Sequence, residues 1–497
     1  MNVTARTDMR LRCLLPAVLA ATTCIALPLE NWRLPFYRIA SDFERSDGSP
    51  SRMFWDGIGT ADLFDSTIWL TVPRDAENFW VLEPSAGGGG TYPRPRHHET
   101  SFFYHGDAFN WIRFRRLTAV QSLDVDKRYE YDPYYPAHSE RGVRGLIEEA
   151  YLRADWKHGF VTVGRKKRSW GPWPDRSLVL SSNPYSYDAV EWQVWGGIFE
   201  FRHLFAPFSM MYASRDSDNG SSRERYLTAH SLNVMFGKWV TIGITETVLF
   251  SRRGGFPDLQ YINPVSIYTV INTNQEGGNG NLMLGFQWNI HPGTDKVSIR
   301  GQLLLDDFQV DNEKTTDQEP AHWGLDIGMY WRGPFPKIGF RHLLKLEYTS
   351  ASEWLYTVPD NNADNAERYI YGRKSLGLPY NDGYCVKLSM LAVPERYGAC
   401  GISFSYGQRG GNSPMSRWND SEHVRGLPYD TGLPQQHRLA AGAEGVFYFR
   451  DYAHLYVCGD LGWTRNKENV ETASFSFDPS VTVEAAVHFS DFFRRLP

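Results

Sequence analysis

Residues 281–307 read NLMLGFQWNIHPGTDKVSIRGQLLLDD, a stretch in which apolar and polar side chains alternate twice. In its first half, Phe286 and Trp288 share one face, while Gln287 lies on the other. The same alternation resumes after a short connection, 291–296. Because successive side chains of a strand point to opposite faces, this pattern predicts an antiparallel hairpin whose two faces meet different surroundings.

The same rhythm recurs along most of the chain and predicts sixteen strands. Soluble β-sandwiches also alternate, so the connections must decide between the two classes. Every second connection is short and the others are long, as in a bacterial outer-membrane barrel with tight periplasmic turns and long outer loops. An even strand number also places both chain ends on the periplasmic side. The predicted strands are 108–130, 144–156, 160–167, 189–204, 207–214, 226–236, 239–250, 281–290, 297–308, 321–331, 338–349, 383–393, 396–408, 437–450, 453–464 and 481–491.

Charged residues on the second face of these strands separate a barrel from a sandwich. Lys345, Glu347, Arg438 and Glu444 all lie opposite the apolar face of their strands. A polar lumen can hold such groups, whereas burial in a sandwich core would be costly. We therefore expect an all-β fold, a transmembrane antiparallel β-barrel of 16–18 strands with short periplasmic turns and long outer loops.

The composition agrees with this class and excludes several others. The 497 residues are 15% aromatic and 42% hydrophobic, with a mean hydropathy of −0.44 and a net charge of −5. Weak acidity argues against a nucleic-acid binder built on a basic face, and the aromatic content excludes a disordered chain. The histidines show no metal-ligand spacing, and no Gly-rich loop joins a strand to a helix. The sequence therefore predicts no cofactor, no metal and no nucleic-acid partner.

The beginning of the chain predicts export from the cytoplasm. In residues 1–26, three arginines precede an apolar core, 13–21, and small residues follow, which is the layout of a cleavable secretory signal peptide. Residues 27–107 contain short apolar pieces and then the glycine run 87–90, so a periplasmic plug or the first strands of the barrel remain open for this region. We expect the barrel itself to occupy 108–497.

Aromatic and charged residues gather in the long outer loops, where they suit a polysaccharide. Aromatic rings stack on apolar sugar faces, and carboxylate, amide and guanidinium groups bind hydroxyls. The alternatives are a loop that folds into the lumen around its own tryptophans, a self-satisfied loop network, or rim aromatics that anchor the barrel in the bilayer. No residue is predicted to be catalytic. The candidate polysaccharide-binding residues are Trp170, Trp173, Asp175, Arg176, Arg252, Arg253, Tyr261, Asn263, Glu347, Trp354, Tyr371, Arg373 and Asp382.

Several short strings of the chain resemble the capsule assembly Wzi family of outer-membrane proteins. The strings include Val163-Gly-Arg165 followed by Trp170-Gly-Pro172, Tyr261-Ile-Asn-Pro264 and Glu347-Tyr-Thr349. Each string is short, but their shared order over roughly residues 160–390, about half of the chain, is similar to that family.

This resemblance implies an eighteen-stranded barrel in a Gram-negative outer membrane, acting as a non-catalytic lectin that holds capsular polysaccharide at the cell surface. The implied partners are capsular or other surface polysaccharide, outer-membrane lipid and lipopolysaccharide, and a polysaccharide export complex. Two features depart from the family: its N-terminal helical bundle has no clear counterpart in 27–107, and the chain ends Phe492-Phe-Arg-Arg-Leu-Pro497 without a terminal aromatic residue.

Two other functions remain open from the sequence. A porin-like channel for small solutes needs the same barrel with an open lumen. A surface hydrolase needs a Ser, His and Asp cluster, for which no strand face offers a convincing arrangement. Whether the long loops close the lumen separates the lectin from the channel.

Overall fold

The structure is a computed structural model, and all structural statements concern the residues that it describes. Within those residues, no helix has the length and apolar content needed to cross a membrane. The predicted signal peptide lies outside them. The described residues are 78–92, 101–130, 132–136, 144–172, 177–208, 224–252, 256–274, 280–294, 296–307, 322–335, 341–358, 365–393, 398–416, 433–449, 453–472 and 474–488.

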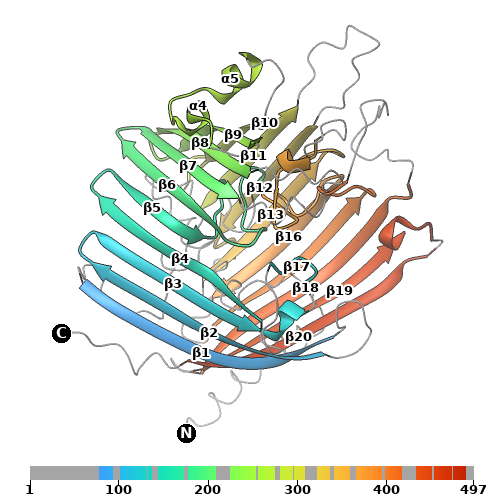
Figure 1. Ribbon diagram of the computed structural model, residues 1–497. Helices are drawn as coiled ribbons and strands as arrows, with labels where there is room; N and C mark the ends of the chain where they lie inside the picture. Colours follow the sequence, from blue (N-terminus) through green and yellow to red (C-terminus); the bar gives the residue numbers. More distant parts are fainter. Residues whose placement is uncertain are drawn as a thin grey trace.

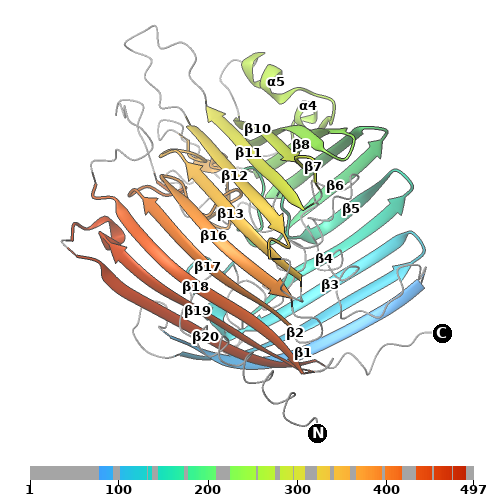
Figure 2. The same cartoon turned by 180° about the vertical axis from the view of Figure 1, so that it is seen from behind.

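Eighteen antiparallel strands form one closed barrel, as Figures 1 and 2 show from opposite sides. Each strand pairs with its neighbour along the chain, and the last strand, β20, pairs with β1 to close the ring. The barrel strands are β1 Asn78–Tyr92, β2 Ser101–Phe114, β3 Leu117–Asp126, β4 Gly145–Trp156, β5 Gly159–Lys166, β6 Tyr187–Gly196, β7 Phe199–Phe208, β8 Glu224–Phe236, β9 Val240–Arg252, β10 Gly280–Ile290, β11 Val297–Asp307, β12 His322–Arg332, β13 Arg341–Ala351, β16 Gly383–Val393, β17 Gly398–Arg409, β18 Gln436–Phe449, β19 Ala453–Arg465 and β20 Ser476–His488.

Short elements occupy the connections between the barrel strands. The minor elements are the hairpin β14 Ile370–Tyr371 with β15 Lys374–Ser375, the helices α4 Leu259–Ile262 and α5 Tyr268–Asn274, and the 3-10 turns η2 Lys127–Glu130, η4 Asn365–Glu367 and η5 Lys467–Asn469.

Tight turns and long loops alternate, as the sequence predicts, so they lie at opposite ends of the barrel. The turn between β4 and β5 spans 157–158, whereas the next connection spans 167–186. In outer-membrane barrels the tight turns are periplasmic and the long loops face outward, and we name the two ends accordingly. The first residue of β1 and the last residue of β20 both lie at the tight-turn end, which is the periplasmic end.

The two faces of the wall differ in burial along each strand. In β2, Tyr104 and Ile112 are exposed on the outside, while His105 and Trp111 are buried on the lumen side. Exposed apolar side chains lie on the outside of most other strands as well, and Leu346 of β13 is one of them. The alternation seen in the sequence is therefore the alternation between a lipid-facing and a lumen-facing side.

The glycine run of β1 lies at the seam where the ring closes. A Cβ atom on Gly87 would lie 2.5 Å from the carbonyl oxygen of Ala485, and one on Gly89 would lie 2.0 Å from that of Val483. Both contacts are closer than any side chain tolerates, so the strands approach because these positions have no side chain. A stretch that could serve as a linker is instead the first strand.

The barrel begins earlier than predicted and has two more strands than the sixteen named above. Residues 78–107 supply β1 and the first half of β2, so the barrel starts at Asn78 and not at residue 108. The predicted strand 108–130 is also two strands, β2 and β3, which reverse direction at Arg115 and Arg116. Arg115 adopts a φ of 53°, which arginine rarely takes, and neither residue is a usual turn former.

The predicted turn at 205–206 is wrong. β6 and β7 are joined by Gly197 and Ile198, so the predicted strands 189–204 and 207–214 are replaced by 187–196 and 199–208. The Gly196-Gly197 pair is the turn signal, because Gly197 has a φ of 58° that favours glycine.

Replacing Gly197 by alanine should destabilise this turn by about 1–2 kcal/mol, because a Cβ atom is disfavoured at positive φ. The matched control is Gly196→Ala, since a Cβ atom at either position meets no atom within 4 Å and only Gly197 has positive φ. Thermal unfolding of the folded barrel in detergent should show a lower midpoint for Gly197→Ala than for Gly196→Ala. Equal midpoints would contradict the turn assignment.

Candidate functional site

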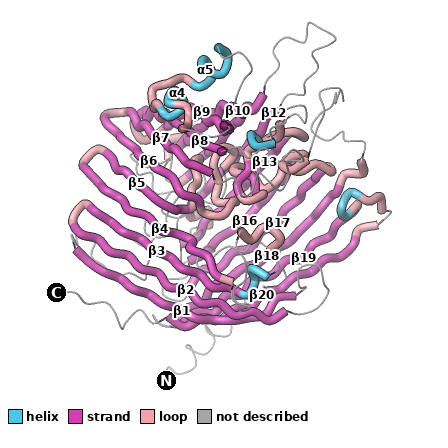
Figure 3. The backbone as a smooth tube through the Cα atoms, in the orientation of Figure 1, coloured by secondary structure: helices cyan, strands magenta, loops and turns pink. Residues whose placement is uncertain are grey.

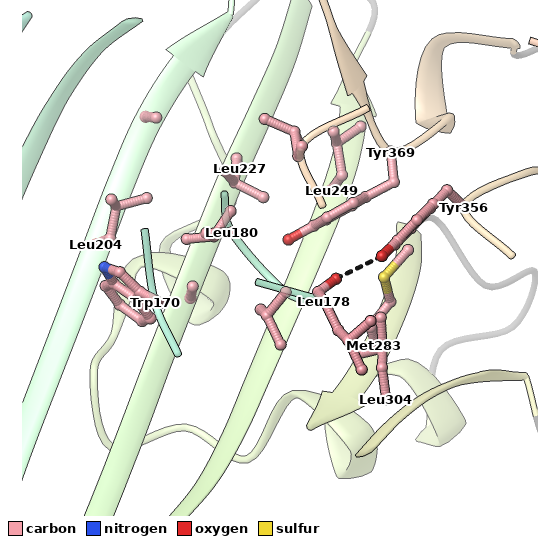
Figure 4. Close-up of a cluster of buried hydrophobic side chains, with 14 of the residues drawn as sticks. Trp170, Leu178, Leu180, Leu204, Leu227, Leu249, Met283, Leu304, Tyr356 and Tyr369 are labelled. Atoms are coloured by element: carbon pink, nitrogen blue, oxygen red, sulfur yellow. Dashed lines mark hydrogen bonds between the residues drawn. The ribbon is translucent and has the colours of Figure 1, made fainter. Parts of the chain in front are cut away.

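Two outer loops fold back into the lumen and pack against its wall. Figure 3 shows loop segments inside the ring of strands. One loop, 167–186, joins β5 to β6, and the other, 352–382, joins β13 to β16. Their side chains form one apolar core with lumen-facing residues of the wall, part of which Figure 4 shows. This core consists of Trp170, Leu178, Val179, Leu180, Tyr187, Ala189, Leu204, Ala206, Phe208, Leu227, Ala229, Leu249, Met283, Leu304, Ala351, Leu355, Tyr356, Tyr369, Leu376 and Leu378.

Hydrogen bonds join the two loops to each other inside the lumen. The Tyr356 hydroxyl donates to the carbonyl oxygen of Leu178 at 2.8 Å, the bond drawn in Figure 4. The Ser181 amide donates to the Leu376 carbonyl at 2.7 Å. Since Tyr356 and Leu178 are fully buried, these bonds form away from water and hold the loops as one unit.

Trp170 belongs to this interior and is not open to a ligand. Its indole N–H donates to Glu191 on β6 at 3.1 Å, and the guanidinium of Arg202 lies 4.4 Å from the ring centroid. Arg202 and Arg168 also donate to the carboxylate of Glu191, at 2.8 and 3.1 Å. Of the two explanations open for this tryptophan, packing within a lumen loop is the one that the structure supports.

Side chains of β8 and β11 hold the two loops in place. The Gln302 side chain accepts from the Leu178 amide at 2.6 Å and donates to the Trp170 carbonyl at 3.2 Å. Arg225, which is buried, donates to the backbone carbonyls of Arg368 and Ile370, each at 2.8 Å. The wall therefore determines the position of both loops through polar bonds as well as through apolar packing.

Three outer loops meet in a group of tyrosines at the outer end, which we call the three-loop cluster. Its rings are Tyr129 and Tyr135 from the loop 127–144, Tyr185 from the loop 167–186, and Tyr371 from the loop 352–382. We include in it the neighbouring residues Asp132, Tyr134, Arg144, Arg373 and Lys374 of the same loops. The rings of Tyr129 and Tyr135 are stacked with centroids 5.0 Å apart. Tyr371 packs against Tyr187 at 5.5 Å and against Phe208 at 4.8 Å.

Charged groups surround these rings. Asp132 accepts a hydrogen bond from the Tyr185 hydroxyl and another from the Lys374 ammonium at 3.1 Å. That ammonium also lies 4.1 Å from the centroid of the Tyr185 ring, and Arg144 lies 5.7 Å from that of Tyr135. Burial raises the pKa of Tyr185, and the neighbouring Asp132 raises it further, so the hydroxyl stays protonated and donates. Burial lowers the pKa of Lys374, while the charge of Asp132 opposes that shift.

Part of the three-loop cluster remains accessible to solvent. Tyr134 is 39% exposed, Arg373 is exposed, and Tyr135, Tyr371 and Lys374 are half-buried. Arg373 has a φ of 64° in the turn between β14 and β15, two residues after Tyr371, which pairs with Lys374 across this hairpin. Rings fixed by their neighbours and accessible charged groups on one surface can contact a sugar chain by stacking and hydrogen bonding.

The predicted site residues do not form a single site. Tyr371 and Arg373 lie in the three-loop cluster, and Glu347 faces the lumen from β13, where it accepts from the Tyr330 hydroxyl at 3.1 Å. Trp354 and Asp382 are buried in the loop 352–382. Arg252, Tyr261 and Asn263 lie elsewhere, on the outside of the wall near β9. Trp173, Asp175, Arg176 and Arg253 lie outside the described residues.

The loop that contributes most to the three-loop cluster was not among the predicted binding loops. Asp132-Pro-Tyr-Tyr-Pro136 directly follows β3 and η2 and has the same mixture of tyrosine, proline and charge as the loops that were selected. The predicted strand 108–130 merges β2 and β3 into one strand. The connection after residue 130 was therefore not recognised as an outer loop. The residues of the cluster absent from the prediction are Tyr129, Asp132, Tyr134, Tyr135, Arg144, Tyr185 and Lys374.

The fold resembles solved outer-membrane barrels, although no protein family model and no curated sequence matches the chain. Wzi from Escherichia coli, described as an outer membrane protein involved in group 1 capsule assembly and a carbohydrate-binding β-barrel, aligns with a TM-score of 0.60 at 12% identity, over 91% of this chain and 97% of that one. OccAB4 from Acinetobacter baumannii aligns with a TM-score of 0.44 at 9% identity, over 84% and 99% of the two chains. At 12% identity, the likeness to Wzi shows an outer-membrane barrel fold and nothing finer.

Replacing Tyr356 by phenylalanine should destabilise the barrel by about 1–2 kcal/mol, because the Leu178 carbonyl and the Leu378 amide lose their shared buried partner. Thermal unfolding in detergent measures the change. Tyr134→Phe, in which the altered ring is 39% exposed, is the control and should unfold like the wild type. A Tyr356→Phe midpoint equal to that of the control would show that the loops are not held by this hydroxyl.

Asp382 makes the stability of the loops depend on pH. Burial raises its pKa from 3.8 to about 6, although the Asn412 amide, which donates to its carboxyl at 3.0 Å, opposes the shift. The folded protein therefore binds this proton more tightly than the unfolded chain does. The resulting stabilisation is complete below about pH 4 and is lost as the pH rises through about 6.

Asp382→Asn should remove this part of the pH dependence, because an amide cannot ionise but still accepts from Asn412. Unfolding midpoints at pH 4 and pH 7 should differ less for Asp382→Asn than for the wild type. Glu468→Gln, which changes an exposed carboxylate of another outer loop, should keep the wild-type difference. An unchanged difference in Asp382→Asn would refute the role of this carboxyl.

Proposed function

We propose that this protein is a non-enzymatic outer-membrane barrel that binds capsular or other surface polysaccharide at the cell surface. The main support is the arrangement of the outer loops, which pack inside the lumen and leave the three-loop cluster accessible at the outer end. The fold likeness to Wzi, a carbohydrate-binding barrel, agrees with this function. The proposal includes export through the N-terminal signal and residence in a Gram-negative outer membrane, where a polysaccharide export complex and lipopolysaccharide would be its neighbours.

The accessible part of the three-loop cluster favours an acidic polysaccharide. Arg144, Arg373 and Lys374 supply positive charge here, while the half-buried carboxylate of Asp132 already accepts from Tyr185 and Lys374. Guanidinium groups bind carboxylates through paired hydrogen bonds, and Tyr134 provides an exposed ring for the apolar face of a sugar. We propose binding alone at this cluster, with no chemical step.

A porin-like channel is the second candidate, and one observation favours it. Lys387 of β16 faces the lumen, because it pairs with Glu347, and yet it is exposed. Ser405 and Arg438, on the neighbouring strands, are half-buried on the same side of the wall. Planar-bilayer recording separates the two candidates: stepwise ion conductance by the wild type would favour a channel along β16–β18, and silence would favour the binding protein.

Binding of purified capsular polysaccharide from the native host tests the main proposal. The double variant Tyr134→Ala/Arg373→Ala should bind at least about tenfold more weakly, because it loses a stacking ring and a charged hydrogen-bond donor. Lys467→Ala, at an exposed position on the loop 466–475, is the matched control and should bind like the wild type. Unchanged affinity in the double variant, with an unchanged unfolding midpoint, would refute the site.

A further inference from the structure

The loop between β9 and β10 lies against the outside of the barrel, not inside it. Residues 256–274, which we call the outer strap, contain α4 and α5, and Figures 1 and 2 place both beside β8, β9 and β10. Tyr261 of the outer strap packs against Phe250 with ring centroids 4.8 Å apart, and Tyr268 packs 4.4 Å from His230.

The wall residues beneath the outer strap have the lipid-facing parity. Along β8, Tyr226 and His230 alternate with Leu227 and Ala229, and the latter pair belongs to the lumen core. Tyr226 is instead buried in a separate apolar cluster with Tyr261 of the strap. The outer strap therefore covers a stretch of wall that would otherwise face lipid.

Beneath the outer strap, a carboxylate of the wall is hydrogen-bonded to an imidazole at the depth of the membrane. Glu246 of β9 lies directly opposite His230 of β8, with Oε2 and Nε2 3.1 Å apart. Glu246 follows Val240, the first residue of β9, by six positions. That spacing is about 20 Å along the strand, or about 15 Å along the axis of a barrel with strands tilted by about 40°, within an apolar band about 25 Å tall.

The outer strap supplies the hydrogen bonds that lipid could not. The Tyr268 amide donates to Glu246 Oε2 at 2.9 Å, and the Thr269 hydroxyl donates to Oε1 at 2.6 Å. The Tyr268 hydroxyl bonds to the Thr228 hydroxyl at 2.9 Å. At the outer end, Arg252 of β9 pairs with Asp258 at the start of the strap. These bonds fasten the strap from the rim down to the level of Glu246.

The other side of the outer strap is apolar, unlike a loop exposed to water. Asp258 is the one charged residue in the sequence of 256–274. The lipid-facing wall nearer the periplasmic end of β9 also carries exposed aliphatic residues, Ile242 at 46% and Ile244 at 41%. The exposed apolar residues of the strap are Phe256 at 73%, Leu259 at 67%, Val265 at 81%, Ile267 at 59% and Val270 at 51%.

We propose that the outer strap is a membrane-embedded element whose outer surface contacts the acyl chains of the outer leaflet. Its inner surface seals the Glu246–His230 pair from hydrocarbon, and its outer surface continues the apolar belt of the wall. The continuity with that belt selects lipid over a second copy of the chain, because the exposed residues extend the lipid-facing surface and do not form an isolated patch. This inference rests on the barrel fold and is independent of polysaccharide binding.

Photocrosslinking in vesicles of palmitoyl-oleoyl phosphatidylcholine tests the outer surface. Val265 is replaced by the photoreactive residue p-benzoylphenylalanine, and the products are identified by mass spectrometry. We expect lipid adducts at position 265 in a yield similar to that at Ile402, which is 48% exposed on the lipid-facing side of β17. The same residue at Val470, 63% exposed in an outer loop, should give at least about tenfold less lipid adduct. A yield at 265 equal to that at 470, or crosslinks between chains, would overturn the proposal.

Proteolysis tests the inner surface. Glu246→Ala removes the acceptor of the Tyr268 and Thr269 bonds, so proteinase K should cleave the outer strap at least about tenfold faster in the same vesicles. Glu468→Ala, an exposed carboxylate on another loop, is the matched control and should be cleaved like the wild type. Equal cleavage of all three proteins would overturn the anchoring role of Glu246. If Glu246→Ala does not fold, the crosslinking result at 265 decides the proposal alone.

Discussion

Hydrocarbon offers no hydrogen-bond partner to a peptide N–H or C=O, and the rest of this structure depends on that constraint. Every strand must be paired on both edges, so the sheet closes through β20 and β1. Closure brings backbones into the close contact that Gly87 and Gly89 permit. The same constraint applies to side chains on the outside of the wall, where Glu246 is compatible with lipid because the outer strap provides its donors.

A ring of this many strands is too wide for the side chains of its wall to fill. Two outer loops occupy part of it, and the lumen therefore contains an apolar core in a region that the sequence marks as polar. Charged residues of the wall are not excluded by this core but pair within it. Glu191 accepts from Arg168, Arg202 and the indole of Trp170, so a buried carboxylate has three donors.

Features that depend on the alternation of side chains along the chain could be predicted from the sequence. Features that depend on contacts between distant residues could not. Strand period and the alternation of short and long connections are local, and they predicted the barrel and its two ends. The reversal at Arg115 has no turn signal, and Gly87–Gly90 looks like a linker until the partner strand is known. In the loops, composition identified Tyr371 but could not distinguish it from Trp170, because only the fold determines which aromatic residue is buried. The loop 132–136 could have been predicted from the sequence if the β2–β3 hairpin had been placed correctly.

The seam between the first and last strands also imposes an order of assembly. β1 and β20 are separated in sequence by the other sixteen strands of the barrel, so the ring cannot close before the final strand has been delivered to the membrane. The loops 167–186 and 352–382 are interlocked inside that ring through Tyr356 and Leu178. These two loops must therefore pack together either before the glycine seam closes or afterwards, inside the confined lumen of the closed ring.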